Sequence, residues 1–282
     1  MSRYFNQSRQ TLERAASVGE GNKPELVRIL QEVTNAVAVP AETLDARLGR
    51  CRKVRLGAYT GKRLMSSHPN FPAAIIESYR ALRIRMLKLQ AAQKLRSFII
   101  TSAVGGEGKT LTTMNLALCC SQLPDLRILV IDADLRTRGL TCLFDNPPGP
   151  GLSDILAGQS EYQEALLSTD YSNLFVIGAG GSSTPAPELY SGRQWKDLID
   201  WASQVFPLIL VDSPPVLPVA DFEQIVHACD GVLAVVRARQ TSRELLKEMA
   251  GRMDSKKLVG VIFNGASSDH SREYGSGYSS GF

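Results

Sequence analysis

Short, continuously apolar runs alternate with helix-patterned stretches through most of the chain. From residue 96 onward these runs read, in order, SFIITSA, RILVIDAD, NLFVIGAG, PLILVDSPP, GVLAVVRA and LVGVIFNGA. A strand that is apolar at every position is buried on both faces, and alternation with helices indicates parallel βαβ units. The pattern therefore predicts an α/β fold, a doubly wound and mostly parallel sheet, over residues 71–265.

The segments on either side of this domain carry different patterns. Apolar residues are spaced as in a helix at 7–19 and 25–37, and a basic stretch follows at 47–63, with seven Lys or Arg residues and no acid. These features predict an N-terminal extension over 1–70, in which two short helices and a basic linker lie outside the main core. The last segment, 266–282, is dominated by Ser and Gly and is expected to be a flexible tail.

The composition is ordinary for a globular protein. Hydrophobic residues make up 44% of the chain, and a net charge of +4 is too small by itself to imply nucleic-acid binding. The five cysteines form no C-x-x-C pair, the three histidines show no metal-ligand spacing, and no apolar stretch approaches the length of a membrane-spanning helix. We therefore expect a cytoplasmic protein with reduced thiols and no nucleic-acid partner.

The sequence FIITSAVGGEGKTLTTMNLALCC predicts a strand, a glycine-rich turn and a helix, which is the context of a phosphate-binding P-loop. Glycines let backbone N–H groups approach the phosphates, and the helix N-terminus adds its dipole to the same anion. Lys109 is expected to reach the β- and γ-phosphates, and the Thr110 hydroxyl to ligate Mg²⁺. The residues expected to contact the nucleotide are Gly105, Gly106, Glu107, Gly108, Lys109, Thr110 and Leu111.

Two further apolar runs end in acidic residues. ILVIDADLR places Asp132 and Asp134 after one strand, and LILVDSPP places Asp212 after another. The carboxyl ends of parallel strands face the same edge of a sheet, so these carboxylates are expected to face the P-loop. Phosphoryl transfer needs Mg²⁺ on oxygen ligands and a group that orients or deprotonates the attacking hydroxyl. The alternative is that these aspartates only cap the helices that follow.

Taken together, the motifs resemble the bacterial tyrosine autokinases of capsule and exopolysaccharide synthesis, over about residues 70–265. TSAVGGEGKT is similar to the Walker A motif of that family, ILVIDADLR to its Walker A′ motif, D-x-D-x-R, and LILVDSPP to its Walker B motif. Related cell-division-positioning and partitioning ATPases carry an extra lysine early in the P-loop, where this chain has Val104. The resemblance implies a P-loop NTPase of the deviant Walker type that uses ATP and Mg²⁺.

The resemblance also assigns roles to individual residues. It implies that Asp132 activates the acceptor hydroxyl, that Asp134 and Asp212 support the metal together with Thr110, and that Asn264 contacts the adenine. The catalytic residues that it implies are Lys109, Asp132, Asp134 and Asp212.

A helix expected at about 73–92 carries the sequence ESYRALR, which spaces Glu77, Arg80 and Arg83 three residues apart. Taken alone, this spacing indicates a solvent-exposed face with a weak i,i+3 ion pair. The resembling family uses E-x-x-R-x-x-R at this place to join subunits into a ring. The resemblance therefore implies a ring-like homo-oligomer.

Tyr274 and Tyr278 lie in the predicted tail. In the resembling family, tail tyrosines are phosphorylated by a neighbouring copy, so both residues are expected to be phosphoacceptors. Family tails usually hold denser tyrosine clusters, and a Ser/Gly-rich tail with incidental aromatic residues is the alternative.

The partners are likewise implied by the resemblance. It points to a membrane adaptor of the polysaccharide co-polymerase type, which recruits the kinase to the inner face of the cell membrane, and to a cognate phosphotyrosine phosphatase. The basic stretch 47–63 either meets anionic lipid head groups or is a solvated linker.

The expected function is that of an ATP-dependent protein-tyrosine autokinase which regulates exopolysaccharide or capsule polymerisation or export. Two alternatives remain open at this point. One is a non-kinase P-loop ATPase switch of the partitioning or cell-division-positioning type, and the other is a nucleotide-binding scaffold without turnover.

Overall fold

A computed structural model describes residues 48–57, 64–65, 71–145, 147, 149–219 and 221–266. The chain divides into two units, Met1–Arg50 and Cys51–Phe282, and nearly all of the described residues belong to the second. The sequence-based predictions that lie outside the described residues concern 7–19, 25–37, Tyr274 and Tyr278.

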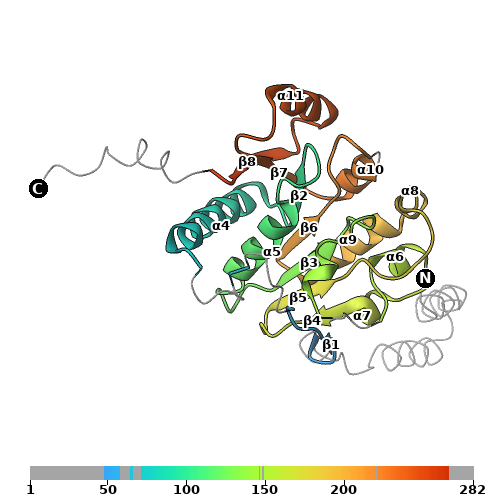
Figure 1. The fold of residues 1–282 in the computed structure, drawn as a ribbon. Coiled ribbons are helices and arrows are strands. Elements are labelled where there is room, and N and C mark those ends of the chain that lie inside the picture. The colour runs from blue at the N-terminus through green and yellow to red at the C-terminus, as the bar shows by residue number, and fades with distance from the viewer. Residues whose placement is uncertain are drawn as a thin grey trace, which may run out of the picture. The chain divides into compact units, whose positions relative to one another are not determined.

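An eight-stranded sheet runs through the second unit in the order β1-β4-β5-β3-β6-β2-β7-β8 (Figure 1). Neighbouring strands are parallel, except that β4 and β5 are antiparallel. The strands are β1 (Arg52–Lys53), β2 (Ser97–Ser102), β3 (Ile128–Asp132), β4 (Leu166–Ser168), β5 (Leu174–Ile177), β6 (Leu208–Asp212), β7 (Gly231–Arg237) and β8 (Leu258–Asn264). The mostly parallel sheet that the apolar runs predict is confirmed.

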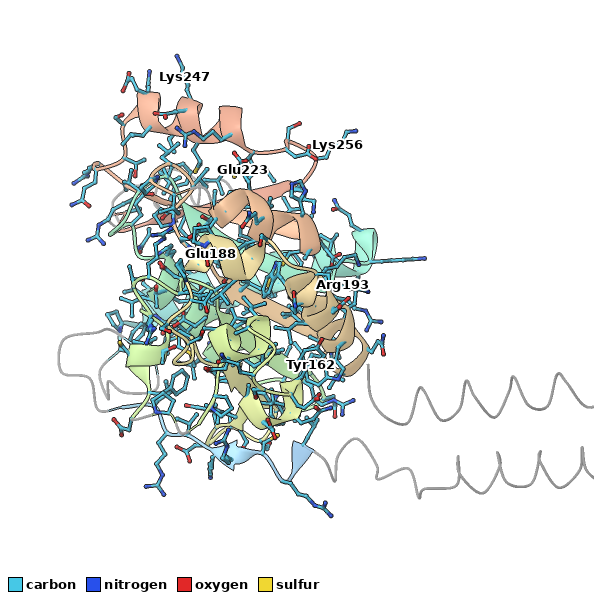
Figure 2. The ribbon with its side chains drawn as sticks, turned by 90° about the vertical axis from the view of Figure 1, so that its right-hand side faces the viewer. Tyr162, Glu188, Arg193, Glu223, Lys247 and Lys256 are labelled. Atoms are coloured by element: carbon cyan, nitrogen blue, oxygen red, sulfur yellow. The ribbon has the colours of Figure 1, made fainter. Side chains whose placement is uncertain are left out.

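Helices cover both faces of this sheet, as the doubly wound fold requires. α5 packs on β2, β3 and β6 and carries α4 on its outer side, whereas α9 packs on β6 from the other face (Figure 1). The helices are α4 (Ala73–Gln93), α5 (Lys109–Cys120), α6 (Leu152–Leu156), α7 (Tyr162–Ala165), α8 (Ala186–Tyr190), α9 (Gln194–Val205), α10 (Asp221–Ala228), α11 (Arg243–Arg252) and the 3₁₀ helix η1 (Thr141–Leu143). Charged side chains such as Glu188, Glu223 and Lys247 point outward from the helices (Figure 2). None of the described helices is both long enough and apolar enough to cross a lipid bilayer.

The central strands are buried along their whole length because helices cover them on both faces. Every residue of β2, β3 and β6 is buried. β3 and β6 are paired in register as far as Asp132 and Asp212, so the two carboxylates lie side by side at the carboxyl edge of the sheet. β8 at the outer edge of the sheet differs, since Val261 and Phe263 are 48% and 67% exposed.

Two short strands, β1 and β4, were not anticipated from the sequence. β4 has three residues and follows α7 directly, so it is too short to show an alternating pattern. α4, in contrast, closely matches the helix expected at 73–92, because its start follows Pro72 and Lys94 ends it in the left-handed conformation.

The described part of the basic stretch packs on the core, whereas the sequence placed this stretch outside it. Arg52–Lys53 pair with β4 in the sheet, and Val54 is buried. Leu64, the residue directly after the stretch, is buried as well. Val54 and Leu56 alternate with exposed cations, so their apolar side chains face inward while the charges stay in water. This alternation is only a few residues long, and the sequence-based prediction rested on the high basic charge of the segment instead. The division of the chain at residue 70 stays a prediction.

Candidate active site

The glycine-rich loop joins buried strand β2 to the first turn of α5. Gly106 and Gly108 have φ angles of +83° and +93°, which strain any residue that carries a side chain. A Cβ added at Gly108 would overlap the Asn264 amide, whereas one added at Gly105 or Gly106 would meet nothing within 4 Å. The loop is therefore closed on the β8 side and open where the N-terminus of α5 offers free N–H groups to an anion.

Polar side chains of the loop itself, of the turn after β7 and of the end of β8 hold this loop in place. The buried Glu107 carboxylate accepts a hydrogen bond from the Val104 N–H (3.1 Å) and one from the Thr241 hydroxyl. The Glu107 carbonyl accepts one from the Asn264 side-chain amide at 2.8 Å. Sequence reasoning named Glu107 and Asn264 as nucleotide contacts, and the structure adds that both brace the loop itself. Thr241 was missed because no motif surrounds it.

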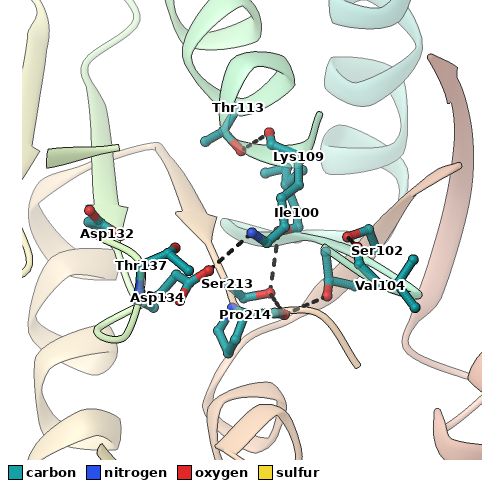
Figure 3. Close-up of polar contacts among 12 residues, drawn as sticks. Ile100, Ser102, Val104, Lys109, Thr113, Asp132, Asp134, Thr137, Ser213 and Pro214 are labelled. Atoms are coloured by element: carbon teal, nitrogen blue, oxygen red, sulfur yellow. Dashed lines mark hydrogen bonds and ion pairs between the residues drawn. The ribbon is translucent and has the colours of Figure 1, made fainter. Parts of the chain in front are cut away.

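Lys109 and Asp134 form a buried ion pair between the P-loop helix and the loop after β3. Their Nζ and Oδ2 atoms are 3.0 Å apart, and their side chains are 10% and 2% exposed (Figure 3). The other oxygen of Asp134 accepts a hydrogen bond from the Thr137 N–H at 3.1 Å. Asp134 therefore compensates the charge of Lys109, the residue that is expected to meet the phosphates.

Asp132 and Asp212 are fully buried neighbours on β3 and β6. The Oδ2 atom of Asp132 accepts hydrogen bonds from the Thr141 N–H (2.7 Å) and hydroxyl (2.6 Å). Three buried carboxylate oxygens have no hydrogen-bond partner among the described residues, namely Oδ1 of Asp132 and both oxygens of Asp212. The Thr110 hydroxyl lies near Asp212, but without hydrogen-bond geometry.

Burial makes these two carboxyls weak acids. It raises the pKa of Asp212 to about 8, an effect that the nearby Asp132 charge strengthens and that Lys109 and Thr110 oppose. Burial also raises the pKa of Asp132 to about 6, although the two hydrogen bonds from Thr141 oppose it. A divalent cation beside the pair would favour the ionised form of both groups.

The donor set fits Mg²⁺ that is bound partly by the protein. Unpaired carboxylate oxygens and the Thr110 hydroxyl are hard oxygen ligands of the kind that Mg²⁺ prefers. No three His, Cys, Asp or Glu side chains in the described part of the chain form a ready-made metal cage. This agrees with the usual mode of Mg²⁺ in nucleotide sites, where one or two protein ligands share the ion with phosphates and water.

Comparison with known proteins decides the family. A family model described as an AAA domain matches residues 96–257, more than half of the chain. Tyrosine-protein kinase YwqD of Bacillus subtilis (strain 168) is 32% identical over 202 residues, which cover 71% of this chain and 84% of YwqD. The chain belongs to the bacterial tyrosine-protein kinases. The family expected from the motifs is thereby confirmed.

Solved structures agree with the bacterial tyrosine kinase assignment. The BceF tyrosine kinase domain is 31% identical with a TM-score of 0.60, and the match covers 67% of this chain and 76% of that domain. The cell-division protein complex MinC:MinD of Aquifex aeolicus is 25% identical with a TM-score of 0.53, covering 63% of this chain and 72% of that chain. The fold is thus that of a P-loop NTPase, shared with a cell-division protein outside the kinases.

Two further contacts hold the acidic loop of this bacterial tyrosine kinase. The buried Tyr190 hydroxyl donates to the carbonyl of Ala133, which stands between the two acids of D-x-D, at 2.8 Å. Arg136, the arginine of D-x-D-x-R, donates to both carboxylate oxygens of buried Asp221 at 2.9 and 3.3 Å. Tyr190 is the last residue of α8, and Asp221 is the first residue of α10. The two contacts join residues that are 57 and 85 positions apart in the sequence, so no local pattern could predict them.

A groove of about 980 Å³ opens between α4, α5 and β8. Asn264 and Leu111, two of the expected nucleotide contacts, line it, whereas the glycines of the loop and the three aspartates do not. The groove therefore adjoins the phosphate site on the side where Asn264 is expected to meet a base.

The three residues of the E-x-x-R-x-x-R motif on α4 are arranged unequally. Glu77 and Arg80 are exposed and form an ion pair with each other. Arg83 is half-buried and donates to the carbonyl of Cys119, at the C-terminal end of α5, at 2.6 Å. Arg83 is thus already engaged within its own chain, and the role of the motif between subunits stays a prediction.

Proposed function

We propose that this chain is an ATP-dependent protein-tyrosine autokinase that regulates exopolysaccharide or capsule polymerisation or export. The observation that supports this most directly is the set of three buried, unpaired carboxylate oxygens on Asp132 and Asp212, beside a P-loop lysine. Unpaired buried oxygens are costly to a fold, so they indicate a site built for a ligand with positive charge and for proton transfer. The relatives named tyrosine-protein kinases support the same conclusion.

In the proposed reaction, backbone N–H groups of the P-loop and Lys109 bind the β- and γ-phosphates. Lys109 exchanges the Asp134 carboxylate for phosphate oxygens. When bound, Mg²⁺ neutralises charge that develops on the phosphates, and Thr110 and Asp212 would hold it with support from Asp134. Asp132 accepts the proton of the tyrosine hydroxyl as that oxygen bonds to the γ-phosphorus and ADP leaves.

The environment of Asp132 suits this role. A general base works best when its pKa lies near the operating pH; burial raises the pKa of Asp132 to about 6, and a cation bound beside it would lower this pKa in part. An ordinary aspartate on the surface would be a weaker base by about two pKa units.

We further propose that the acceptors are Tyr274 and Tyr278, presented by a neighbouring copy in a ring that Glu77, Arg80 and Arg83 help to assemble. The chain would act at the inner face of the membrane through an adaptor of the co-polymerase type, with a phosphotyrosine phosphatase to reverse the reaction. Phosphorylation adds up to about two negative charges per tyrosine and would loosen a ring by repulsion between tails.

One experiment tests the reaction itself. The purified full chain is incubated with ATP and Mg²⁺, with and without the cytosolic end of a co-polymerase, and phosphotyrosine and free phosphate are both measured. We expect phosphotyrosine that is lost in Lys109→Met. Replacing Tyr274 and Tyr278 with Phe is expected to remove the label, and undiminished labelling would contradict these acceptors.

The similarity to MinD supports a second candidate, an ATPase switch without kinase activity. The same experiment separates the two functions. Release of free phosphate that depends on Lys109, without any phosphotyrosine, would favour the switch and contradict the kinase.

A further inference from the structure

The two oxygens of Asp132 lie in unequal surroundings. Oδ2 accepts two hydrogen bonds from Thr141, from the N–H at 2.7 Å and from the hydroxyl at 2.6 Å. Oδ1 is buried and accepts no hydrogen bond of normal geometry from the described residues, and the nearest backbone donor to the carboxylate besides Thr141 is the Asp134 N–H. The carboxylate is thus held by one oxygen and presents the other.

The direction of the Thr141 hydroxyl proton follows from its second contact. The oxygen of this hydroxyl accepts a hydrogen bond from the Ala179 N–H at 2.8 Å. A backbone N–H can only donate, so the single hydroxyl proton is left for Asp132. A short chain of hydrogen bonds therefore runs from the end of β5, through Thr141, to the carboxylate at the tip of β3.

Packing holds Thr141 in place on both sides. Its neighbours Leu140 and Leu143 are fully buried, which anchors the turn that carries it. On the other side, a Cβ added at Gly178 would lie 3.4 and 3.5 Å from the Thr141 side chain, so the backbone after β5 approaches it closely. Thr141 therefore has little freedom to move away from Asp132.

We propose that Thr141 is a positioning residue for the phosphoryl transfer, which fixes Asp132 so that only Oδ1 can receive the proton of the acceptor tyrosine. This inference rests on the proposed function. As the tyrosine oxygen forms its bond to the γ-phosphorus and the bond from phosphorus to ADP breaks, the phenolic proton moves to Oδ1. Oδ2, saturated by the two donors, stays turned toward Thr141. Without the hydroxyl, the carboxylate can rotate and lose its alignment with the acceptor.

The test compares Thr141→Val, Thr141→Ala and Thr141→Ser with a matched control, Thr169→Val, in the full chain. Thr169 is buried, and its hydroxyl donates at 2.9 Å to the carbonyl of Leu174, which is paired with Ile128 at the opposite end of β3 from Asp132. The control therefore loses one buried hydroxyl with no change beside Asp132. The kcat and KM for ATP of tyrosine phosphorylation, the Kd for ATP and the melting temperature are measured for each variant.

We expect kcat to fall by roughly 10- to 100-fold in Thr141→Val and Thr141→Ala, as for a misplaced catalytic group, while KM and Kd for ATP stay within about twofold. Thr141→Ser restores the donor and is expected to keep kcat within about threefold of the unmodified chain. The control is expected to lower the melting temperature but not kcat.

Three outcomes would overturn the role of Thr141. The first is that Thr141→Val and Thr141→Ala both have the same kcat as Thr169→Val. The second is that they change the KM or Kd for ATP and not kcat. The third is that Thr141→Ser is as slow as Thr141→Ala. Thr141→Ala adds no methyl group against the Ala179 N–H, so it remains informative if Thr141→Val does not fold. If the unmodified chain makes no phosphotyrosine at all, it is the proposed function that fails.

Discussion

The P-loop and the pair of acidic strand tips face each other across the site, but they are built in different ways. On the loop side, the buried carboxylate of Glu107 and the amide of Asn264 are hydrogen-bonded within the protein. On the acidic side, Asp132 and Asp212 keep three oxygens without partners in the described part of the chain. The loop is thus held by contacts within the protein, whereas in the proposed reaction the acidic pair gains its missing interactions from a bound cation and an acceptor hydroxyl.

Replacement of Lys109 should have the largest effect, because this residue connects the two regions. In Lys109→Met we expect phosphotyrosine and ATP binding to fall at least about 100-fold, and the melting temperature to drop because Asp134 is left buried without its cation. The double variant Lys109→Met/Asp134→Asn should recover the melting temperature but not the activity. Calorimetric titration with ATP and thermal unfolding measure the two effects. Equal melting temperatures for both variants would contradict the buried ion pair.

Replacement of Asp212 should separate stability from activity. Its pKa is about 8 in the fold and near 4 when unfolded. The native state therefore holds a proton that the unfolded state releases, and the contribution of this carboxyl to stability is lost progressively from about pH 4 to about pH 8. Asp212→Asn has no carboxyl proton to release on unfolding. Its free energy of unfolding should therefore exceed that of the unmodified chain by an amount that grows with pH, at most about 1.4 kcal/mol per pH unit.

Chemical unfolding at pH 6, 7 and 8 without nucleotide measures this difference. Asp212→Asn is expected to lose kinase activity at each pH although it is the more stable protein. A difference that stays constant, or one that shrinks as the pH rises, would show that burial does not weaken this acid.

Replacement of a loop brace should have a moderate effect. Asn264→Ala removes the hydrogen bond to the Glu107 carbonyl, which is expected to cost about 1 kcal/mol of stability. Because the phosphates bind the same loop, the KM for ATP should rise several-fold while kcat changes little. Steady-state kinetics with ATP varied from below to above its KM check this, and a loss confined to kcat would place Asn264 with the acidic side instead.

The smallest effect on stability is expected on the outer face of α4. Glu77→Ala removes an exposed ion pair worth a few tenths of a kcal/mol. If the motif joins subunits, the variant should nevertheless elute as a smaller species in size-exclusion chromatography. Arg83→Ala offers a contrast, since it also removes a hydrogen bond to the end of α5 and should lower stability further.

Much of the fold could be predicted because its signals are local. A run such as LILVD is apolar at every position, and this marks a strand covered on both faces wherever it occurs. The acidic residues at the strand ends could be assigned to the same edge of the sheet, because parallel strands all end at that edge. The buried Val54 and strand β4 could not be predicted from the sequence. The strand before Val54 pairs with residues more than a hundred positions away. Strand β4 has three residues, which are too few to show an alternating pattern.

The sequence by itself determined the α/β class, the phosphate-binding loop and the identity of the three aspartates, because glycine spacing and strand ends are properties of short segments. Only the tertiary structure decided which of those groups are paired. Lys109 meets Asp134, Thr141 holds one oxygen of Asp132, and neither oxygen of Asp212 accepts a hydrogen bond of normal geometry from the described residues. Burial, the charge of a neighbour and the direction of a hydroxyl proton depend on segments that fold together from distant parts of the chain, and they set the chemistry of the site.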